Sequence, residues 1–463
     1  MPHPSALPDL LAALRTPLGE RISVADAVRA HHGHDESCHP DALPDAVAWP
    51  HNTAEVSAIA RLCSQYGVPL IPYGAGSSVE GHTLAIHGGI SLDMSQMNRI
   101  VAVHEADLTA TVEAGVTRMQ LNRELRHSGL FFPIDPGADA TLGGMSATRA
   151  SGTNAVRYGT MRENVLALTA VLASGEVVHT GSRARKSSAG YDLTRLLVGS
   201  EGTLAIITEV TVRLYGMPEA MSAAVVNFDS VRGAVDTVIQ SIQCGIPLAR
   251  AEMLDGLTMQ AVNRHSRTDY PERPTLFLEF HGTAQAVAEQ AAMVGELAAA
   301  NGGGDFAWAT QDEDRNKLWQ ARHNAYFAGL QLQPGSRCVA TDVCVPISRL
   351  SECIEATYAD LAAEGVAAPL FGHVGDGNFH LMLLVQPGDD ASLARAKAIN
   401  HRLVLRAQQM EGTCTGEHGI GIGKQAYLAA EAGTHGLQLM RAIKQALDPQ
   451  GLLNPGKIFP LQP

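Results

Sequence analysis

Two histidines, seven positions apart, give this chain its clearest chemical signal. The stretch FGHVGDGNFH holds His373 and His380, and the later stretch TGEHG holds Glu417 and His418. Two imidazoles and one carboxylate are the ligand set of an open metal site, and the remaining imidazole can then act as a base. The alternative is an ordinary pair of turn and strand histidines, because histidine spacing alone is a weak motif. The intervening glycines predict a turn before a strand that begins near Phe379.

The composition is that of an acidic, globular protein with more than one domain. The 463 residues include 34 lysines and arginines against 47 aspartates and glutamates, a formal net charge of −13. A nucleic-acid partner is therefore not expected, and there is no basic patch for anionic lipid. The local clusters Arg157/Arg162 and Arg183/Arg185/Lys186 are exceptions that could meet phosphates. A chain of this length exceeds one ordinary core.

The cysteines and the N-terminal residues indicate the cellular compartment in which the protein is expected. Seven scattered cysteines without a CxxC pair indicate reduced thiols in a cytosolic protein. Pro2, His3, Pro4 and Asp9 do not form a basic start with an apolar core, so no signal peptide is expected. No apolar run approaches ~18 residues, so no membrane span is expected. We expect a cytoplasmic protein, with peripheral binding at the inner membrane as the alternative.

Glycine-rich turns punctuate an alternation of helix and strand in the first half. A helix is expected at the start, followed by an irregular His-rich turn around residues 31–39 that is expected to be solvated, with a metal site as the alternative. The turn at 73–78 lets backbone N–H groups approach an anion closely. Six glycines from Gly129 to Gly159 are too many for packed helix or sheet and indicate backbone wrapped around a ligand, with a flexible loop as the alternative.

The sequence pattern changes at residues 215–218, and we expect a domain boundary there. Residues 220–400 repeat strand–helix–strand blocks, including a long Ala/Glu helix at 284–300, which suggests an α+β layer with an antiparallel sheet. No GxGxxG motif opens a βαβ unit, so a nicotinamide enzyme of the Rossmann type is not supported.

Four glycine-rich stretches resemble the FAD-binding stretches of the vanillyl-alcohol-oxidase/p-cresol-methylhydroxylase flavoproteins. They are YGAGSS (73–78), DPGADATLGG (135–144), GSEGTL (199–204) and NPGK (454–457). The two histidine-containing stretches narrow the resemblance to the branch of cytochrome-type D-lactate dehydrogenases, glycolate oxidase flavin subunits and D-2-hydroxyglutarate dehydrogenases. The motifs stand in the family's order, from residue 45 to the C-terminus.

The resemblance implies an α+β fold with a two-subdomain FAD-binding domain of the p-cresol-methylhydroxylase type and an α+β cap or substrate domain with an antiparallel sheet. The expected divisions are an N-terminal extension (1–44), the FAD-binding domain (45–217), the cap (218–410) and a C-terminal segment (411–463) that completes the active site and the FAD domain. Covalent relatives tether FAD through a histidine where this chain reads SSVEG (77–81), followed by His82. Non-covalent FAD is therefore expected.

The FAD-binding residues implied by the resemblance lie in four groups along the chain. Those for the pyrophosphate are Tyr73, Gly74, Ala75, Gly76, Ser77, Ser78, Pro136, Gly137, Thr141, Gly143 and Gly144; those for the ribityl chain and ring are Ser151, Asn154, Arg157, Tyr158 and Gly159; Glu201, Gly202, Ile206 and Ile207 flank the adenine side, and Asn454 closes over the flavin.

The metal-dependent branch implies roles for the residues of the opening motif. His373, His380 and Glu417 would bind a divalent ion, zinc or manganese, and His418 would be the base. A 2-hydroxy acid that chelates such an ion has its hydroxyl pKa lowered. His418 would take the hydroxyl proton while the C2 hydride goes to flavin N5, a task that suits neutral imidazole.

The remaining matches and departures concern the substrate. Arg322 matches the family's carboxylate-binding arginine, with a surface helix arginine as the alternative. Lys424 is a further match that could simply be a solvated helix residue. Relatives that accept a second carboxylate carry a lysine where this chain reads VATDV (339–343), and an asparagine where it has Met382. Because a buried unpaired carboxylate is costly, these departures favour a small monocarboxylate.

The sequence therefore predicts an FAD- and metal-dependent D-2-hydroxy-acid dehydrogenase, with D-lactate to pyruvate as the first candidate reaction. Electrons would pass to a cytochrome, a quinone or an electron-transfer flavoprotein, and a homodimer is one expected form. The alternatives are a glycolate oxidase flavin subunit, a D-2-hydroxyglutarate dehydrogenase, a metallohydrolase built on the same ligands, and a flavin-binding subunit without activity of its own. Long ligand-wrapping loops argue against the hydrolase, and His418 argues against the inactive subunit.

Overall fold

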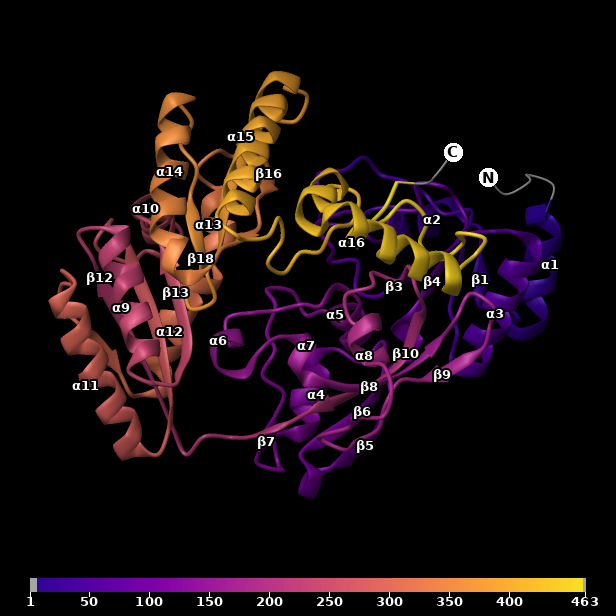
Figure 1. The fold of residues 1–463 in the computed structure, drawn as a ribbon, viewed down its shortest axis with the longest axis horizontal. Helices are drawn as coiled ribbons and strands as arrows, with labels where there is room; N and C mark the ends of the chain where they lie inside the picture. The colour runs from indigo at the N-terminus through magenta and orange to yellow at the C-terminus, as the bar shows by residue number, and fades with distance from the viewer. Residues whose placement is uncertain (1–5, 461–463) are drawn as a thin grey trace. The chain divides into compact units, whose positions relative to one another are not determined.

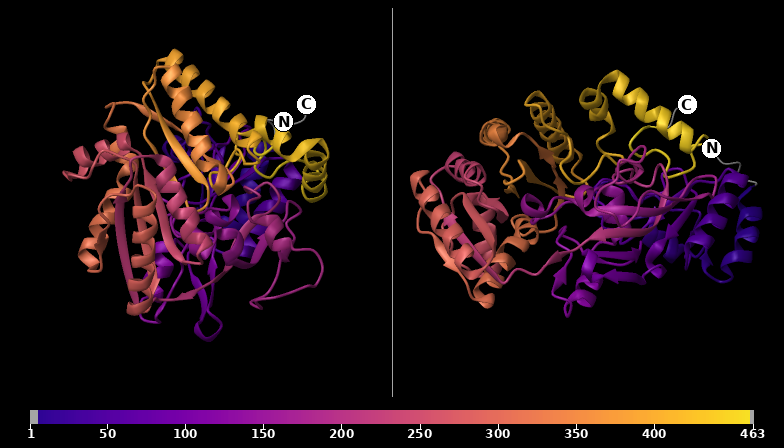
Figure 2. Two further views of the ribbon diagram at one scale, coloured as in Figure 1. Left: turned by 60° about the vertical axis from the view of Figure 1, so that its left-hand side comes forward. Right: turned by 60° about the horizontal axis from the view of Figure 1, so that its bottom comes forward.

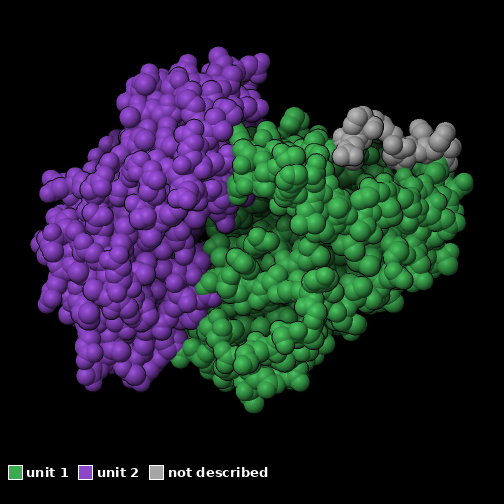
Figure 3. Space-filling view, in the orientation of Figure 1, with its two compact units in different colours: residues 1–151, 159–217, 417–463 green, residues 152–158, 218–416 purple. Residues whose placement is uncertain are grey.

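The computed structural model describes residues 6–460, apart from the side chain of Asp312 (Figure 1). Pro2, His3 and Pro4, on which the signal-peptide expectation partly rests, lie outside the described residues. The chain divides into two compact units: residues 1–151, 159–217 and 417–463 form the first, and residues 152–158 and 218–416 form the second (Figure 3). The chain therefore passes between the units after residues 151, 158, 217 and 416.

The first unit contains two main sheets. One has the strand order β1-β2-β4-β3, in which β2, β4 and β3 are parallel, and the other is antiparallel with the order β5-β6-β10-β8-β9. Its strands are β1 (Ile22–Ser23), β2 (Ala46–Ala48), β3 (Leu70–Tyr73), β4 (Ile90–Asp93), β5 (Ile100–His104), β6 (Thr109–Glu113), β8 (Val165–Val171), β9 (Val177–His179) and β10 (Ile206–Arg213), with the small pair β7 (Leu130–Phe131) and β11 (Tyr215–Gly216).

Helices cover these sheets and link them. They are α1 (Ala6–Leu18), α2 (Asp26–His32), α3 (Thr53–Tyr66), α4 (Arg118–Leu125), α5 (Leu142–Thr148), α7 (Met161–Asn164), α8 (Leu193–Leu197) and α16 (Gln425–Leu447), with the 3-10 turns η1 (Met94–Gln96) and η2 (Glu105–Asp107). The apolar faces of α1 and α3 pack on the four-stranded sheet, in a core that also takes in Leu453 from the chain's end. Leu453 is placed there because its neighbours bond to β3: Leu70 N donates to Leu452 O, and Asn454 N donates to Leu70 O.

One antiparallel sheet organises the second unit, in the order β15-β12-β14-β13-β18-β19-β16, with β17 also paired to β19. Its strands are β12 (Ala220–Asn227), β13 (Leu248–Leu254), β14 (Thr275–Gly282), β15 (Ala307–Ala309), β16 (Arg337–Ala340), β17 (Val343–Cys344), β18 (Leu370–His373) and β19 (Asn378–Val385). The α+β class and the antiparallel sheet are therefore confirmed, and β19 begins one residue before the predicted Phe379.

The helices of the second unit are α6 (Ala155–Tyr158), α9 (Val231–Gln243), α10 (Gly256–Ser266), α11 (Ala284–Ala300), α12 (Asp312–His323), α13 (Ala325–Leu330), α14 (Leu350–Ala363) and α15 (Asp390–Gln409), with the 3-10 turn η3 (Ile347–Arg349). Helices α9 and α11 run along strands β12, β13 and β14 (Figure 1, Figure 2). Apolar residues of α10, α12 and α13 pack on the sheet around Phe277, Phe371 and Met382. In the described part of the chain, no helix is both long and apolar enough to cross a membrane.

The prediction that the glycine-rich section contains no packed helix is wrong at residues 142–148. These residues form α5, whose first turn is capped by Thr141 Oγ1, 3.2 Å from Gly144 N. A Cβ on Gly143 would lie 2.6 Å from the Cβ of Ala114, so glycine is what allows this helix to touch the end of β6.

The expectation of a solvated His-rich turn is wrong for His32. This residue ends α2 and is buried, with Nε2 2.9 Å from Asp93 Oδ2 and Nδ1 2.9 Å from Val28 O. Trp49 Nε1 donates to the same Asp93 oxygen at 2.8 Å. His32 is thus part of a buried hydrogen-bond network at the C-terminal end of β4.

Candidate functional site

The two histidines of the opening motif come together at the junction of two paired strands. His373 ends β18 and His380 lies on β19, across the turn at 374–377, and the strand register pairs Phe371 with His380. Both rings are buried, with centroids 5.6 Å apart, and a nitrogen of each lies within 4.8 Å of a nitrogen of the other. The antiparallel turn brings the two rings together.

The hydrogen bonds of the two rings assign their tautomers. His380 Nδ1 lies 3.0 Å from the carbonyl oxygen of Thr341, and His373 Nδ1 lies 2.6 Å from Oε1 of Glu252. Because a carbonyl and a carboxylate accept hydrogen bonds, each Nδ1 carries the proton and each Nε2 carries the lone pair. Metal-binding histidines usually donate their other N–H to such partners, so this pair fits a divalent ion.

Glu252 is shared between His373 and Arg322. Arg322, on α12, donates from Nε and Nη2 to Oε2 of Glu252, at 3.0 and 2.7 Å. Burial alone would raise the pKa of Glu252, but its electrostatic interactions and hydrogen bonds with His373 and Arg322 bring that pKa below its usual value. The Nε hydrogen and one Nη2 hydrogen of Arg322 are therefore already bonded to Glu252. The outer edge of the guanidinium, which consists of Nη1 and the second hydrogen of Nη2, can bind a ligand carboxylate.

Asp342, Asn378 and Thr415 form a polar patch near the C-terminal end of the second unit. Asn378 Nδ2 donates to Asp342 Oδ1 at 2.8 Å, and Thr415 Oγ1 donates to Asp342 Oδ2 at 2.7 Å. A Cβ on Gly416 would lie 2.8 Å from Asn378 Cγ, so only glycine fits at this close approach. Glu417 follows Gly416 through one peptide bond and is the first residue of the chain's return to the first unit.

Glu201 anchors the segment that begins with Glu417 and His418. In the first unit its carboxylate accepts the backbone N–H groups of Ile420 and Gly421, at 2.7 and 2.8 Å. His418 Nε2 lies 3.8 Å from Glu417 Oε1 in this segment.

Buried charges surround this anchor. His82 Nε2 lies 3.1 Å from Glu201 Oε2. Burial acts to lower the pKa of His82, but the carboxylates of Glu201, Glu80 and Asp35 together raise it above its usual value. Lys424 is buried in an ion pair with Glu80, so the solvated alternative for Lys424 is wrong.

The remaining sequence-predicted residues, which stay predictions as FAD ligands, are distributed over both units. In the first unit Tyr73 ends β3, Gly74 to Ser78 form the following loop, and Pro136 and Gly137 lie in a further loop. Thr141 caps α5, whose first turn holds Gly143 and Gly144, and Ser151 and Gly159 flank the segment 152–158. Glu201 and Gly202 form a turn, Ile206 and Ile207 open β10, and Asn454 follows α16. Asn154, Arg157 and Tyr158 belong to the second unit.

The glycine loops of the first unit converge. A Cβ on Gly74 would lie 2.5 Å from Thr141 Oγ1, which joins the 73–78 loop to the start of α5. Asn454 Nδ2 donates to the carbonyls of His82 and Glu201, at 2.9 and 2.8 Å. Within the described residues, the N–H groups of residues 74–78 donate to no protein acceptor. A loop with unpaired N–H groups fits an anionic group such as a pyrophosphate.

The segment 152–158 is fixed to the sheet of the second unit. Asn154 Oδ1 accepts from Arg250 Nε at 3.0 Å, and Arg157 Nη1 donates to the carbonyls of Pro247 and His281. The hydroxyl of Tyr158 lies 2.8 Å from His281 Nδ1. These contacts account for Asn154, Arg157 and Tyr158 without a ligand, and their predicted contact with FAD stays a prediction.

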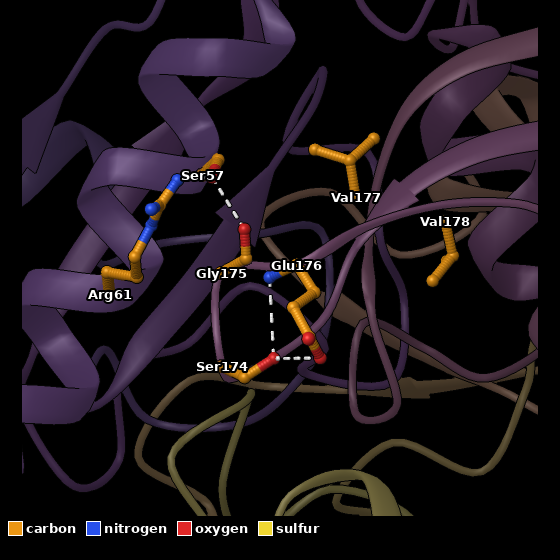
Figure 4. Close-up of a pocket in the computed structure, with 7 residues that line it drawn as sticks. All are labelled: Ser57, Arg61, Ser174, Gly175, Glu176, Val177 and Val178. Carbon is orange, nitrogen blue, oxygen red and sulfur yellow. Dashed lines mark hydrogen bonds between the residues drawn. The ribbon is translucent and has the colours of Figure 1, made fainter.

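The first unit has a hollow of about 540 Å³ on its surface. It is lined by Ser57, Arg61, Ser174, Gly175, Glu176, Val177 and Val178 (Figure 4). Its polar groups bond to one another: Arg61 donates to Ser57 Oγ, and Ser57 donates to Gly175 O. It contains no histidine, cysteine or paired carboxylate, and we assign it no chemistry.

Sequence reasoning missed Glu252 and the carbonyl of Thr341. Glu252 lies in RAEML, an apparently ordinary strand, and it is 121 residues from His373. The only available signal is that Glu252 lies in a strand whose other residues, apart from Arg250, are apolar, since a glutamate is rarely buried unless it is paired.

Comparison with known proteins defines the family. Residues 44–181 match an FAD binding domain, and residues 217–458 match the C-terminal domain of FAD linked oxidases. A probable mitochondrial D-lactate dehydrogenase of Danio rerio is 50% identical over 99% of this chain and 93% of that protein. The chain belongs to the FAD-linked oxidases.

Other relatives of this FAD-linked oxidase agree with the assignment. The mitochondrial D-lactate dehydrogenase [cytochrome] of Arabidopsis thaliana is 44% identical over 98% of this chain and 80% of that protein. The crystal structure of p-cresol methylhydroxylase with substrate bound has a TM-score of 0.79 and 18% identity, covering 99% of this chain and 98% of that one. The predicted fold of the p-cresol-methylhydroxylase type is confirmed, and this FAD-linked oxidase is an FAD-dependent oxidoreductase.

Proposed function

We propose that this FAD-linked oxidase oxidises a small D-2-hydroxy acid, with D-lactate to pyruvate as the first candidate. The observation that carries the proposal is the pair of buried rings of His373 and His380, whose Nδ1 atoms bond to Glu252 and to the Thr341 carbonyl, in a chain whose relatives are named D-lactate dehydrogenases. The first unit would be the FAD domain with its C-terminal segment, and the second the substrate-binding cap.

His373, His380 and Glu417 would hold a divalent ion, zinc or manganese. Two imidazoles and a carboxylate leave open positions for a bidentate substrate. When bound, such an ion supplies Lewis-acid chemistry that lowers the pKa of a hydroxyl. Support comes from the hydrogen bonds that fix both rings and from the short connection between Gly416, packed beside Asn378, and Glu417.

FAD would lie, non-covalently, against the converging loops of the first unit. When bound, it supplies the two-electron acceptor chemistry of the reaction. The N–H groups of residues 74–78 would hold its pyrophosphate, with Thr141, Gly143 and Gly144 beside them. Glu201 and Gly202 would flank the adenine side, and Asn454, which donates to the carbonyls of His82 and Glu201, would close over the flavin.

Arg322 and His418 would act directly on the substrate. Arg322 would bind the substrate carboxylate through its outer edge, because its Nε side is bonded to Glu252. His418 would accept the hydroxyl proton at a ring nitrogen, the usual role of a neutral imidazole.

The side chains around His380 support a small monocarboxylate. Met382, two residues beyond His380 on β19, is buried, and its sulfur faces Gly329 of α13. Thr341 is buried and uses its hydroxyl to accept the N–H of Leu381 at 2.9 Å. Neither position offers a cation or amide for a second carboxylate, and such a group would be costly to bury unpaired. The electron acceptor would be a cytochrome, as in the name of the Arabidopsis relative.

Anaerobic flavin bleaching tests the proposal. The purified protein is mixed with D-lactate, L-lactate, glycolate and D-2-hydroxyglutarate, before and after treatment with a chelator and again after zinc or manganese is restored. We expect D-lactate to bleach the flavin fastest, the chelator to slow it, and the metal to restore it.

The other outcomes distinguish the alternatives. Faster bleaching by glycolate would make the protein a glycolate oxidase flavin subunit. Faster bleaching by D-2-hydroxyglutarate would overturn the argument from Met382 and Thr341. If the chelator does not affect bleaching, the reaction does not require a metal ion, and the proposed metal site is wrong.

A further inference from the structure

Glu252 joins two groups that the proposed reaction uses for different purposes. It stands opposite His373 in the register of β13 and β18, so the pairing of the strands itself sets their contact. One carboxylate oxygen accepts from His373 Nδ1 at 2.6 Å, and the other accepts from Arg322 Nε and Nη2. No other described residue bonds to both of these side chains.

The two contacts have separate chemical consequences. A carboxylate on Nδ1 fixes the imidazole in the tautomer with an Nε2 lone pair and raises its basicity as a ligand. The same carboxylate turns the Arg322 guanidinium so that only its outer edge remains for a ligand. The charge of Arg322 in turn balances that of Glu252, whose side chain is 1% exposed.

We propose that Glu252 is a positioning residue that holds His373 as a metal ligand and Arg322 as the substrate-carboxylate donor in one rigid unit. The inference rests on the proposed function, which assigns the metal and the carboxylate to these two residues. It adds a physical link between metal affinity and substrate affinity, both of which depend on one side chain.

The sheet contains a matched comparison. Glu279 on β14 is also buried, bonds to a histidine (His281 Nε2, 2.7 Å) and lies 3.7 Å from an arginine (Arg250 Nη1). His281, however, uses its second ring nitrogen on the hydroxyl of Tyr158. Glu279 therefore has the burial and partner types of Glu252, without a proposed metal ligand.

The test compares Glu252→Gln with Glu279→Gln. In the flavin-loaded, metal-stripped protein, the dissociation constants of Zn²⁺ and Mn²⁺ are measured by competition with a chromophoric chelator, and flavin content reports folding. The amide of Glu252→Gln can face His373 or Arg322 with its oxygen, but not both. We expect metal affinity to fall about 10- to 100-fold in Glu252→Gln and to stay at the wild-type value in Glu279→Gln.

Substrate binding gives a second readout. With saturating metal, the KM for D-lactate should rise in Glu252→Gln, because Arg322 has lost its support. Should Glu252→Gln not fold, Glu252→Asp replaces it: that variant keeps the charge but is one methylene too short to reach both partners, and the same loss of metal affinity is expected.

Two results overturn the inference. One is wild-type metal affinity in the Glu252 variants, and the other is an equal loss in Glu279→Gln, which would indicate general damage to the sheet. If the wild-type protein binds no metal, the metal site of the proposed function is wrong. That outcome differs from the two above, which contradict only the role of Glu252.

Discussion

Glu80 and Lys424 form a buried ion pair, with Oε1 and Nζ 3.0 Å apart, between the loop after β3 and the segment that carries Glu417 and His418. The main chain reinforces this contact, since Ile422 N donates to Glu80 O at 2.9 Å. The loop after β3 thus fixes the end of the C-terminal segment that the proposed chemistry needs.

Replacing Lys424 with methionine should destabilise the first unit by about 3–5 kcal/mol, because it removes the ammonium group that faces the buried Glu80 carboxylate. Adding Glu80→Gln should recover part of that loss, since the negative charge that the ammonium group faced is then also removed. Urea unfolding of the two variants and the wild type measures both effects. A double variant less stable than Lys424→Met would contradict this account of the pair.

The Glu201→Gln variant should loosen the segment after His418. The carboxylate now accepts two N–H groups, and hydrogen bonds to a charged group contribute about 1.5–3 kcal/mol each. A neutral amide is a weaker acceptor, so the N–H groups of Ile420 and Gly421 should exchange with deuterium at least about tenfold faster. Mass spectrometry of peptides covering this segment reports the change.

The control for this experiment is Glu209→Gln, on β10 of the same unit, where the carboxylate accepts from Thr169 Oγ1 instead. Exchange near Ile420 should not change in this variant. Equal exchange in wild type and Glu201→Gln would show that Glu201 does not hold the segment.

Loss of the proposed base should separate FAD binding from chemistry. His418→Ala should keep its flavin but be reduced by D-lactate about 10²- to 10⁴-fold more slowly, the usual contribution of a general base. Stopped-flow reduction measures the rate. His435→Ala, on the exposed surface of α16, is the matched histidine control and should behave as wild type. Reduction of His418→Ala at the wild-type rate would exclude His418 as the base.

Lys457 should make the free energy of unfolding depend on pH in the alkaline range. Its Nζ donates to Leu84 O and Asn454 Oδ1, and burial lowers the pKa of Lys457 to about 8, although Asp35 and Glu201 act to raise it. Between pH 8 and the ordinary lysine pKa of 10.5, the unfolded chain therefore holds more protons than the folded chain. Stability must rise with pH across this window.

The size of the effect is on the order of 3 kcal/mol, from the difference between the two pKa values. It should appear as a growing advantage of the wild type over Lys457→Met between pH 8 and 10, measured by denaturant unfolding of the flavin-loaded proteins. A constant difference across this range would mean that the Lys457 pKa is not lowered in the folded protein.

Local sequence patterns were sufficient to predict those helices and turns whose structure depends mainly on their own residues. The Ala/Glu run at 284–300 forms α11 over the predicted range, since alanine and glutamate favour helix. The turn at 374–377 contains Gly375 and Gly377, and Gly377 has a positive φ of 81°, which suits glycine. The histidine pair was recognisable because a turn of known length joins both members.

Contacts between distant residues were not predictable in this way. Glu252 meets Arg322 and His373 across 70 and 121 positions, and only the strand register and the placement of α12 bring them together. Gly143 appeared to break helices, yet its lack of a side chain lets α5 approach Ala114. Lys424 looked like a solvated residue because its partner, Glu80, lies in another part of the chain.

The crossings of the chain between its units limit how the protein can be divided. Residues 152–158 leave the first unit for seven positions only, yet they bond to Arg250, Pro247 and His281 on strands β13 and β14 and the turn before β13. A chimaera that takes its second unit from a relative must therefore graft two stretches, 152–158 as well as 218–416. Recombination at the single junction near residue 217 would separate seven residues from the sheet that holds them.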